Sequence, residues 1–173
     1  MKTVFLVLLL NIAAASDLPH PDSFDVTKYL GKWYEAARTK NIRFEKGDKT
    51  YAIYGKLSKD KISVLNHEEL DDGTEREISG VAYPDGSGIP GRLKVVFDRW
   101  YSKLFPGKYY VIDTDYENYS LVVAPFKFWF IDYKMAWILV RDVPVEAELL
   151  ESLFEKMETY AGIKKKDFRI TKH

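Results

Sequence analysis

The sequence contains no cysteine among its 173 residues. This absence excludes disulfides, thiol nucleophiles, thiol redox pairs and zinc sites built on thiolates. Histidine is scarce, and the three residues His20, His67 and His173 are too scattered to predict a metal or haem site. We therefore expect neither a cofactor nor a metal ion.

Net charge is also absent, because 26 basic residues balance 26 acidic ones. A chain without a basic field does not gather nucleic acid, so DNA and RNA are not expected as partners. The length fits one domain whose core is large enough to need no metal or disulfide. Aromatic residues are in excess, since 10 Phe, 12 Tyr and 4 Trp make up 15% of the chain.

The first residues have the pattern of a secretory signal peptide. Lys2 precedes an apolar run from Val4 to Leu10, and small residues follow up to Ser16. The run is too short for a spanning helix, and no later run is long enough. We expect a signal peptide over residues 1–16, a mature domain over 17–173, and a secreted protein, or a periplasmic one in a bacterium.

Short apolar or alternating runs bounded by turn residues fill most of the mature chain, and this pattern is typical of all-β barrels and sandwiches. Eight strands are predicted, over residues 33–38, 49–57, 61–70, 74–83, 92–97, 108–114, 119–124 and 135–141. The short turns between them predict an antiparallel up-and-down order.

The apolar spacing becomes helical after Pro144, with Pro144 expected in the first turn and Gly162 at the C-terminal cap. The strands at 121–124 and 136–140 are apolar on both faces. An amphipathic helix packed on the outside of a closed barrel would cover their outer faces.

Three short motifs identify a resemblance. Gly31-Lys32-Trp33 begins the first strand, Thr114-Asp115-Tyr116 precedes the seventh, and Arg141 ends the eighth. In this order they resemble the signature of the lipocalin family, and further stretches are similar to its apolipoprotein D and bacterial Blc branch. The resemblance implies an eight-stranded barrel that is closed at one end and carries small apolar molecules. It implies a structural role at the closed end for these residues: Gly31, Trp33, Thr114, Asp115, Tyr116 and Arg141.

The candidate ligand site is the barrel interior. The resemblance implies Tyr54 as a cavity residue, and Trp137 lies four residues before Arg141, hence on the same inward face. Alternation along the other strands adds Val64, Asn66, Glu68, Ile78, Val95, Phe97, Tyr110 and Ile112. Asn66 and Glu68 either receive the head of an amphiphile or are solvated near the rim.

Two loops at the expected open end hold much of the aromatic excess. Their rings include Trp100, Phe105, Phe128, Trp129 and Phe130, with lysines between them. Such rings can contact a membrane or close over a ligand. Alternatively, the second loop simply extends its strand pair.

These expectations describe a secreted, monomeric carrier of a fatty acid or lysophospholipid that is not an enzyme. A lipid-acting enzyme of the same fold and a protein-binding module are the alternatives. Asn118 begins an Asn-Tyr-Ser sequon and is a candidate for glycosylation if the source is eukaryotic. The resemblance also implies the disulfide that usually ties the C-terminal tail to the barrel in secreted animal members, and this chain, which has no cysteine, departs from it.

Overall fold

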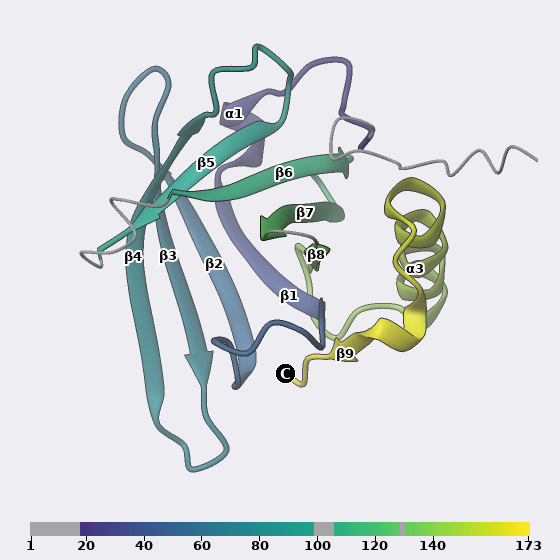
Figure 1. The fold of residues 1–173 in the computed structure, drawn as a ribbon. Coiled ribbons are helices and arrows are strands. Elements are labelled where there is room, and N and C mark those ends of the chain that lie inside the picture. The colour runs from purple at the N-terminus through teal and green to yellow at the C-terminus, as the bar shows by residue number, and fades with distance from the viewer. Residues whose placement is uncertain (1–17, 99–105, 129–130) are drawn as a thin grey trace, which may run out of the picture.

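The computed structural model describes residues 18–98, 106–128 and 131–173. These residues form an antiparallel sheet that closes into a barrel, with one long helix outside it (Figure 1). The predicted signal peptide lies outside the described residues. The strand order β2-β3-β4-β5-β6-β7-β8-β1-β9, with β1 also paired to β2, confirms the predicted up-and-down barrel.

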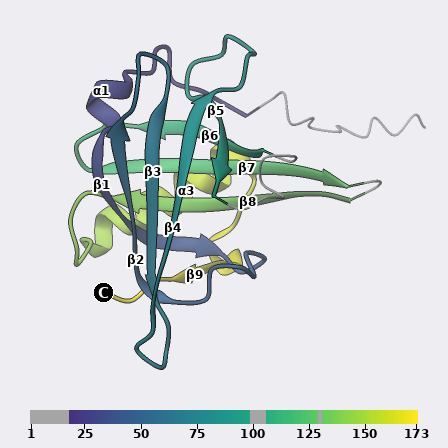
Figure 2. The same ribbon diagram turned by 90° about the vertical axis from the view of Figure 1, so that its left-hand side faces the viewer.

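All eight predicted strands are confirmed, but β7 ends about four residues later and β8 begins about four residues earlier than predicted, whereas the other ends shift by about two residues at most. The elements are α1 (Val26–Tyr29), β1 (Gly31–Thr39), β2 (Asp48–Lys56), β3 (Ile62–Glu69), β4 (Glu75–Pro84), β5 (Arg92–Phe97), β6 (Gly107–Thr114), β7 (Tyr119–Phe128), β8 (Ile131–Val140), α3 (Ala147–Ala161), the 3-10 turn η2 (Lys165–Asp167) and β9 (Phe168–Ile170). Figure 2 shows β7 and β8 extending together beyond the neighbouring strands.

Helix α3 begins later than predicted. Pro144 lies outside it, because Glu146 still has an extended backbone and acts as the N-cap of a helix that starts at Ala147. The C-terminal end is as predicted: Gly162 adopts the left-handed conformation with φ 69° and donates to carbonyls of the last turn.

The sheet separates two hydrophobic clusters. Leu121 and Ile138 point outward and pack with Leu153 and Met157 of α3. Val122 and Leu139, their immediate neighbours in sequence, point into the barrel. This alternation confirms the predicted reason for strands that are apolar on both faces: α3 covers the outer face, and the inner face is buried inside the barrel.

The C-terminal segment is tied to the barrel by hydrogen bonds. Strand β2 pairs only with the first part of β1, residues 31–34. Strand β9 pairs with residues 37–39 of β1, further along the same edge. Beyond β9, the Thr171 hydroxyl donates to the Glu35 carboxylate, and the Lys49 amide donates to the Lys172 carbonyl over 2.7 Å. Neither β9 nor α1 was predicted from the sequence.

The signature residues assemble at one end of the barrel. The Arg141 guanidinium lies 3.7 Å from the ring centre of Trp33, which is fully buried. The same guanidinium donates to the carbonyls of Lys28, Lys32 and Tyr116 at 2.9–3.0 Å. It therefore joins α1, β1 and the β6–β7 turn around one buried ring.

Two further signature residues support this arrangement. Gly31 has φ 95°, and an added Cβ would lie 3.4 Å from the Arg141 guanidinium. Asp115 accepts from the amides of Glu117, Asn118 and Tyr119 and so fixes the β6–β7 turn. The hydrogen bonds to Asp115 lower the pKa of its carboxyl, which is therefore charged at neutral pH.

We expect Arg141→Met to destabilise the fold by about 2–4 kcal/mol, because it removes the cation–π contact and three hydrogen bonds. Urea unfolding measures this difference. Arg43→Met, at an exposed position, is the matched control and should change the free energy of unfolding by less than about 0.5 kcal/mol. Equal stability of the two variants would contradict a supporting role for Arg141.

Candidate functional site

The barrel encloses a cavity of about 640 Å³. Its apolar wall is formed by Ala52, Ile62, Val64, Ala82, Leu93, Val95, Phe97, Ala124 and Leu139, among others. Gly80 leaves room for one of these side chains, because a Cβ there would lie 2.8 Å from the Phe97 ring. The volume lies within the roughly 300–1,000 Å³ typical of small-molecule sites.

Three tyrosine hydroxyls close the narrow end of the cavity. The Tyr109 hydroxyl lies 2.7 Å from that of Tyr54 and 2.9 Å from that of Tyr29, which also contacts Ser120. Burial raises the pKa of Tyr29 to about 12, and it raises the pKa values of Tyr54 and Tyr109 as well. These hydroxyls, which form the floor of the cavity, are neutral and hydrogen-bond to one another. They therefore need no hydrogen-bond partner from a ligand.

Most predicted ligand residues lie in the cavity wall. Those that line it are Tyr54, Val64, Asn66, Val95, Phe97 and Trp137. Glu68, Ile78, Tyr110 and Ile112 are not among the lining residues. Ile78 pairs with Asn66 across β3 and β4, on the side of the open end. Ligand contact by the lining residues remains a prediction.

The predicted face of β6 was wrong. Tyr110 and Ile112 pack in the cluster under α3, whereas Tyr109 and Val111 belong to the interior cluster. Tyr109 stands opposite the inward residue Leu93, and directly paired residues share a face. Both alternations along this strand are apolar, so the pattern does not distinguish inside from outside.

Glu68 holds a loop instead of facing the cavity. Its carboxylate accepts from the amides of Lys46 and Gly47 at 2.8 and 2.7 Å. These bonds lower the pKa of Glu68. The segment 40–47 is thus pinned to β3, and it places Phe44 and Glu45 in the cavity wall.

Glu45 brings a half-buried carboxyl group to this apolar space. Its Oε2 accepts from the Trp137 indole at 2.8 Å. Burial raises the pKa of Glu45 to about 8, and the nearby Glu35 carboxylate adds to the increase. Sequence reasoning missed Glu45, because no periodicity in a loop indicates where a side chain points.

The mouth carries a pair of aromatic rings in tilted contact. Phe126 and Tyr133 stand opposite each other on β7 and β8 with ring centres 5.1 Å apart. Their exposed fractions are 44% and 37%. Strand β7 reaches Phe128, so the second aromatic segment does extend the strand pair. Trp100, Phe105, Trp129, Phe130 and the side chain of Phe128 lie outside the described part of the molecule.

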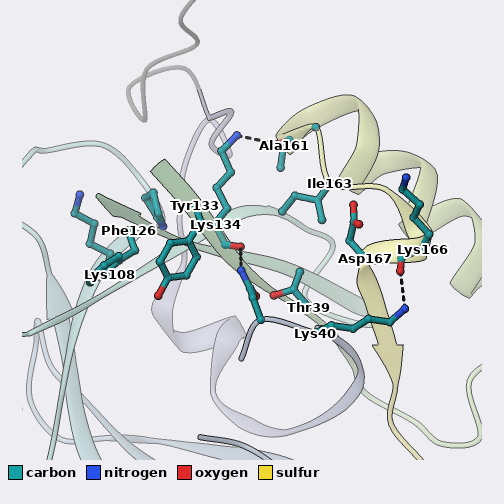
Figure 3. A pocket seen from close by; sticks show the side chains of 13 residues that line it. Thr39, Lys40, Lys108, Phe126, Tyr133, Lys134, Ala161, Ile163, Lys166 and Asp167 are labelled. Atoms are coloured by element: carbon teal, nitrogen blue, oxygen red, sulfur yellow. Dashed lines mark hydrogen bonds between the residues drawn. The ribbon is translucent and has the colours of Figure 1, made fainter. Parts of the chain in front are cut away.

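A second hollow of about 500 Å³, the lysine pocket, lies outside the barrel (Figure 3). Four lysines line it: Lys40, Lys108, Lys134 and Lys166. The Lys134 ammonium donates to the carbonyl of Ala161 at the end of α3 over 2.8 Å. Phe126 and Tyr133 line both the lysine pocket and the barrel cavity and so separate them.

Within the described ranges, no group of three His, Asp or Glu side chains is placed to hold a metal ion. Among the helices described, none is long and apolar enough to cross a membrane. Asn118 is exposed, and its amide donates to Asp115 over 2.8 Å. Its glycosylation remains a prediction.

Comparisons with known proteins agree with this geometry. Residues 24–173 match a protein family described as a lipocalin-like domain. Rat apolipoprotein D is 37% identical over 136 residues, which cover 78% of this chain and 70% of the relative. The outer membrane lipoprotein Blc of Vibrio cholerae is 34% identical over 164 residues, covering 90% of each chain.

A solved structure supports the fold. Insecticyanin from the tobacco hornworm Manduca sexta superposes with a TM-score of 0.76 at 22% identity, covering 90% of this chain and 84% of that one.

Stability should depend on the ionisation of Glu45. The pKa of about 8 lies above the ordinary 4.5, so the folded state holds this proton more tightly than the unfolded state. Its contribution to stability is full below about pH 4.5, declines as the pH rises and levels off above about pH 8. Between pH 5 and pH 9, the free energy of unfolding of the parent should therefore fall by on the order of 2 kcal/mol more than that of Glu45→Gln, which has no proton to lose.

Urea unfolding at both pH values measures this difference. Glu117→Gln, an exposed position in the β6–β7 turn, should keep the parent's pH dependence. An equal pH dependence in Glu45→Gln would show that Glu45 is not a buried titrating group.

Proposed function

The chain belongs to the lipocalin family, whose members bind small hydrophobic ligands, and from this we propose that it transports or sequesters a lipophilic molecule in its barrel cavity. The observation that carries the proposal is the apolar cavity of about 640 Å³ with a closed floor and an open mouth. Most of the residues that line it are apolar, so a ligand with an apolar body fits inside it.

The hydrophobic effect supplies enough free energy for tight binding. Burial of a chain of about sixteen carbons gains on the order of 10 kcal/mol at roughly 0.8 kcal/mol per methylene, before association costs remove a large part. Micromolar binding therefore needs no strong contact to the head of the ligand. Fatty acids and lysophospholipids are the ligand classes that we favour.

Export completes the proposal. A signal peptide over residues 1–16 would deliver a monomeric carrier to the secretory pathway or the periplasm. A lipid-acting enzyme of lipocalin fold and a protein-binding module remain the alternatives. Turnover of a bound lipid would favour the enzyme.

Filling the cavity tests the proposal. Ala82 lines the cavity and is 2% exposed, whereas its neighbour Val81 lies on the other face of β4. We expect Ala82→Phe to lower the affinity for the fluorescent apolar probe diphenylhexatriene by about tenfold or more, because the added ring occupies ligand space. Equilibrium titration of probe fluorescence measures the affinity.

Val81→Phe is the matched control and should bind like the parent. Equal binding by Ala82→Phe, Val81→Phe and the parent would place the ligand outside the barrel and contradict the proposal.

We also propose a peripheral membrane contact at the mouth. The exposed rings of Phe126 and Tyr133 stand between Lys108 on one side and the other lysines of the pocket, as Figure 3 shows. Aromatic rings interleaved with lysines are typical of surfaces that rest on an anionic bilayer. Contact there would bring the mouth to the source of a lipid ligand.

The double variant Phe126→Ser/Tyr133→Ser should partition onto phosphatidylcholine vesicles containing phosphatidylserine about fivefold less, because two apolar rings are lost. Vesicle co-sedimentation measures the partition. Tyr160→Ser, at an exposed ring on α3, should have no effect. An unchanged partition of the double variant would remove the membrane contact from the proposed function.

A further inference from the structure

The polar groups of the barrel cavity differ in how well they are satisfied. Tyr54 and Tyr109 bond to each other at the floor. Glu35 also lines the cavity, and its carboxylate accepts from Arg38 and from the Thr171 hydroxyl. None of these groups needs a ligand atom as a partner.

Glu45 is in a different position. Among the described residues, its carboxyl group has one hydrogen-bond partner, the Trp137 indole at 2.8 Å. Glu45 is half-buried. A carboxylate offers about four acceptor sites, and one that is partly withdrawn from water with few partners has a desolvation cost. Because Glu45 lines the cavity, its unused acceptor sites are available to a ligand.

Asn66 adds a second acceptor to the lining of the cavity. It lines the cavity, and its Oδ1 is buried without a hydrogen-bond partner in the described part of the chain. Both groups therefore have acceptor sites without a donor partner. A ligand that carries a hydrogen-bond donor would satisfy them.

We propose that Glu45 is a specificity-determining residue that selects a single-chain lipophile carrying a hydroxyl group over the same lipophile carrying a carboxylate. This inference rests on the proposed carrier function. Of the two ligand classes favoured there, it selects the lysophospholipid, which carries a free hydroxyl, over the fatty acid. A hydroxyl donates to Glu45 in either protonation state of the carboxyl group. A ligand carboxylate has no proton to donate, and it meets the negative charge of Glu45 once that group is ionised.

The charged groups around Glu45 determine the pH dependence of this choice. Glu35 and Arg38 act on it from β1 and Glu68 from β3. Arg38 pairs with Glu35, and Arg76 lies 3.4 Å from Glu68. Lys108 of β6 also lines the cavity. Because the pKa of Glu45 is about 8, its negative charge develops around this pH. Binding of a carboxylate should weaken as the pH rises through 8, whereas binding of an alcohol should not.

Three ligands of equal chain length test the proposal: dodecan-1-ol, methyl dodecanoate and dodecanoate. Each competes with diphenylhexatriene for the intact mature protein at pH 6.5 and pH 9. We expect the parent at pH 9 to bind the alcohol about tenfold more tightly than the carboxylate, with the ester between them, since one hydrogen bond to a charged group accounts for such a factor. The ratio should be smaller at pH 6.5.

In Glu45→Gln, the ratio of the two affinities should fall to about threefold or less and lose its pH dependence, because the amide is neutral and can both donate and accept. A far-ultraviolet circular dichroism spectrum equal to that of the parent shows that the variant is folded. Glu117→Gln, at the closed end, should keep the parent's ratio.

The outcomes separate the two proposals. If the parent binds neither the probe nor any of the three ligands, the carrier function itself is wrong. If the parent binds all three ligands equally at pH 9, or if Glu45→Gln keeps the parent's preference, the carrier function stands and the role of Glu45 is overturned.

Discussion

The stacking of the Arg141 guanidinium on the buried Trp33 ring is the interaction on which the rest of the structure depends. It closes one end of a barrel whose strands would otherwise leave both ends open. The carbonyls that Arg141 bonds belong to three separate segments, so the closed end is held by one side chain acting as a common donor. With this end closed, the tyrosines above it form a floor, and the space beyond becomes a cavity with one entrance.

Because the chain has no cysteine, hydrogen bonds and packing stabilise the fold without any disulfide. The C-terminal segment is fixed here by the pairing of β9 with β1 and by Arg169, which donates to the Gly47 carbonyl and the Asp48 carboxylate. These contacts reach the segment 40–47, which places Glu45 in the cavity wall. The tail and the ligand site are therefore linked through a single loop.

Much of this molecule could be predicted from the sequence, because its strands alternate and its turns carry the expected residues. The eight strands, the outer helix, the signature residues at the closed end and the inward position of Trp137 all follow from local pattern or resemblance. The exceptions have physical reasons. Strand β6 is apolar on both faces, so Tyr109 and Tyr110 cannot be distinguished by alternation, and strand β9 is too short to give a periodic signal. Glu45 and Glu68 depend on how one loop folds against β3, a tertiary contact that no local pattern contains.

The central claim is that the barrel holds a lipophilic ligand, and native mass spectrometry of the protein purified from its own source tests it most directly. We predict a complex with one equivalent of a lipid-like molecule, which is released on denaturation. A bare polypeptide mass, with no complex formed when dodecan-1-ol or a fatty acid is added, would contradict the claim.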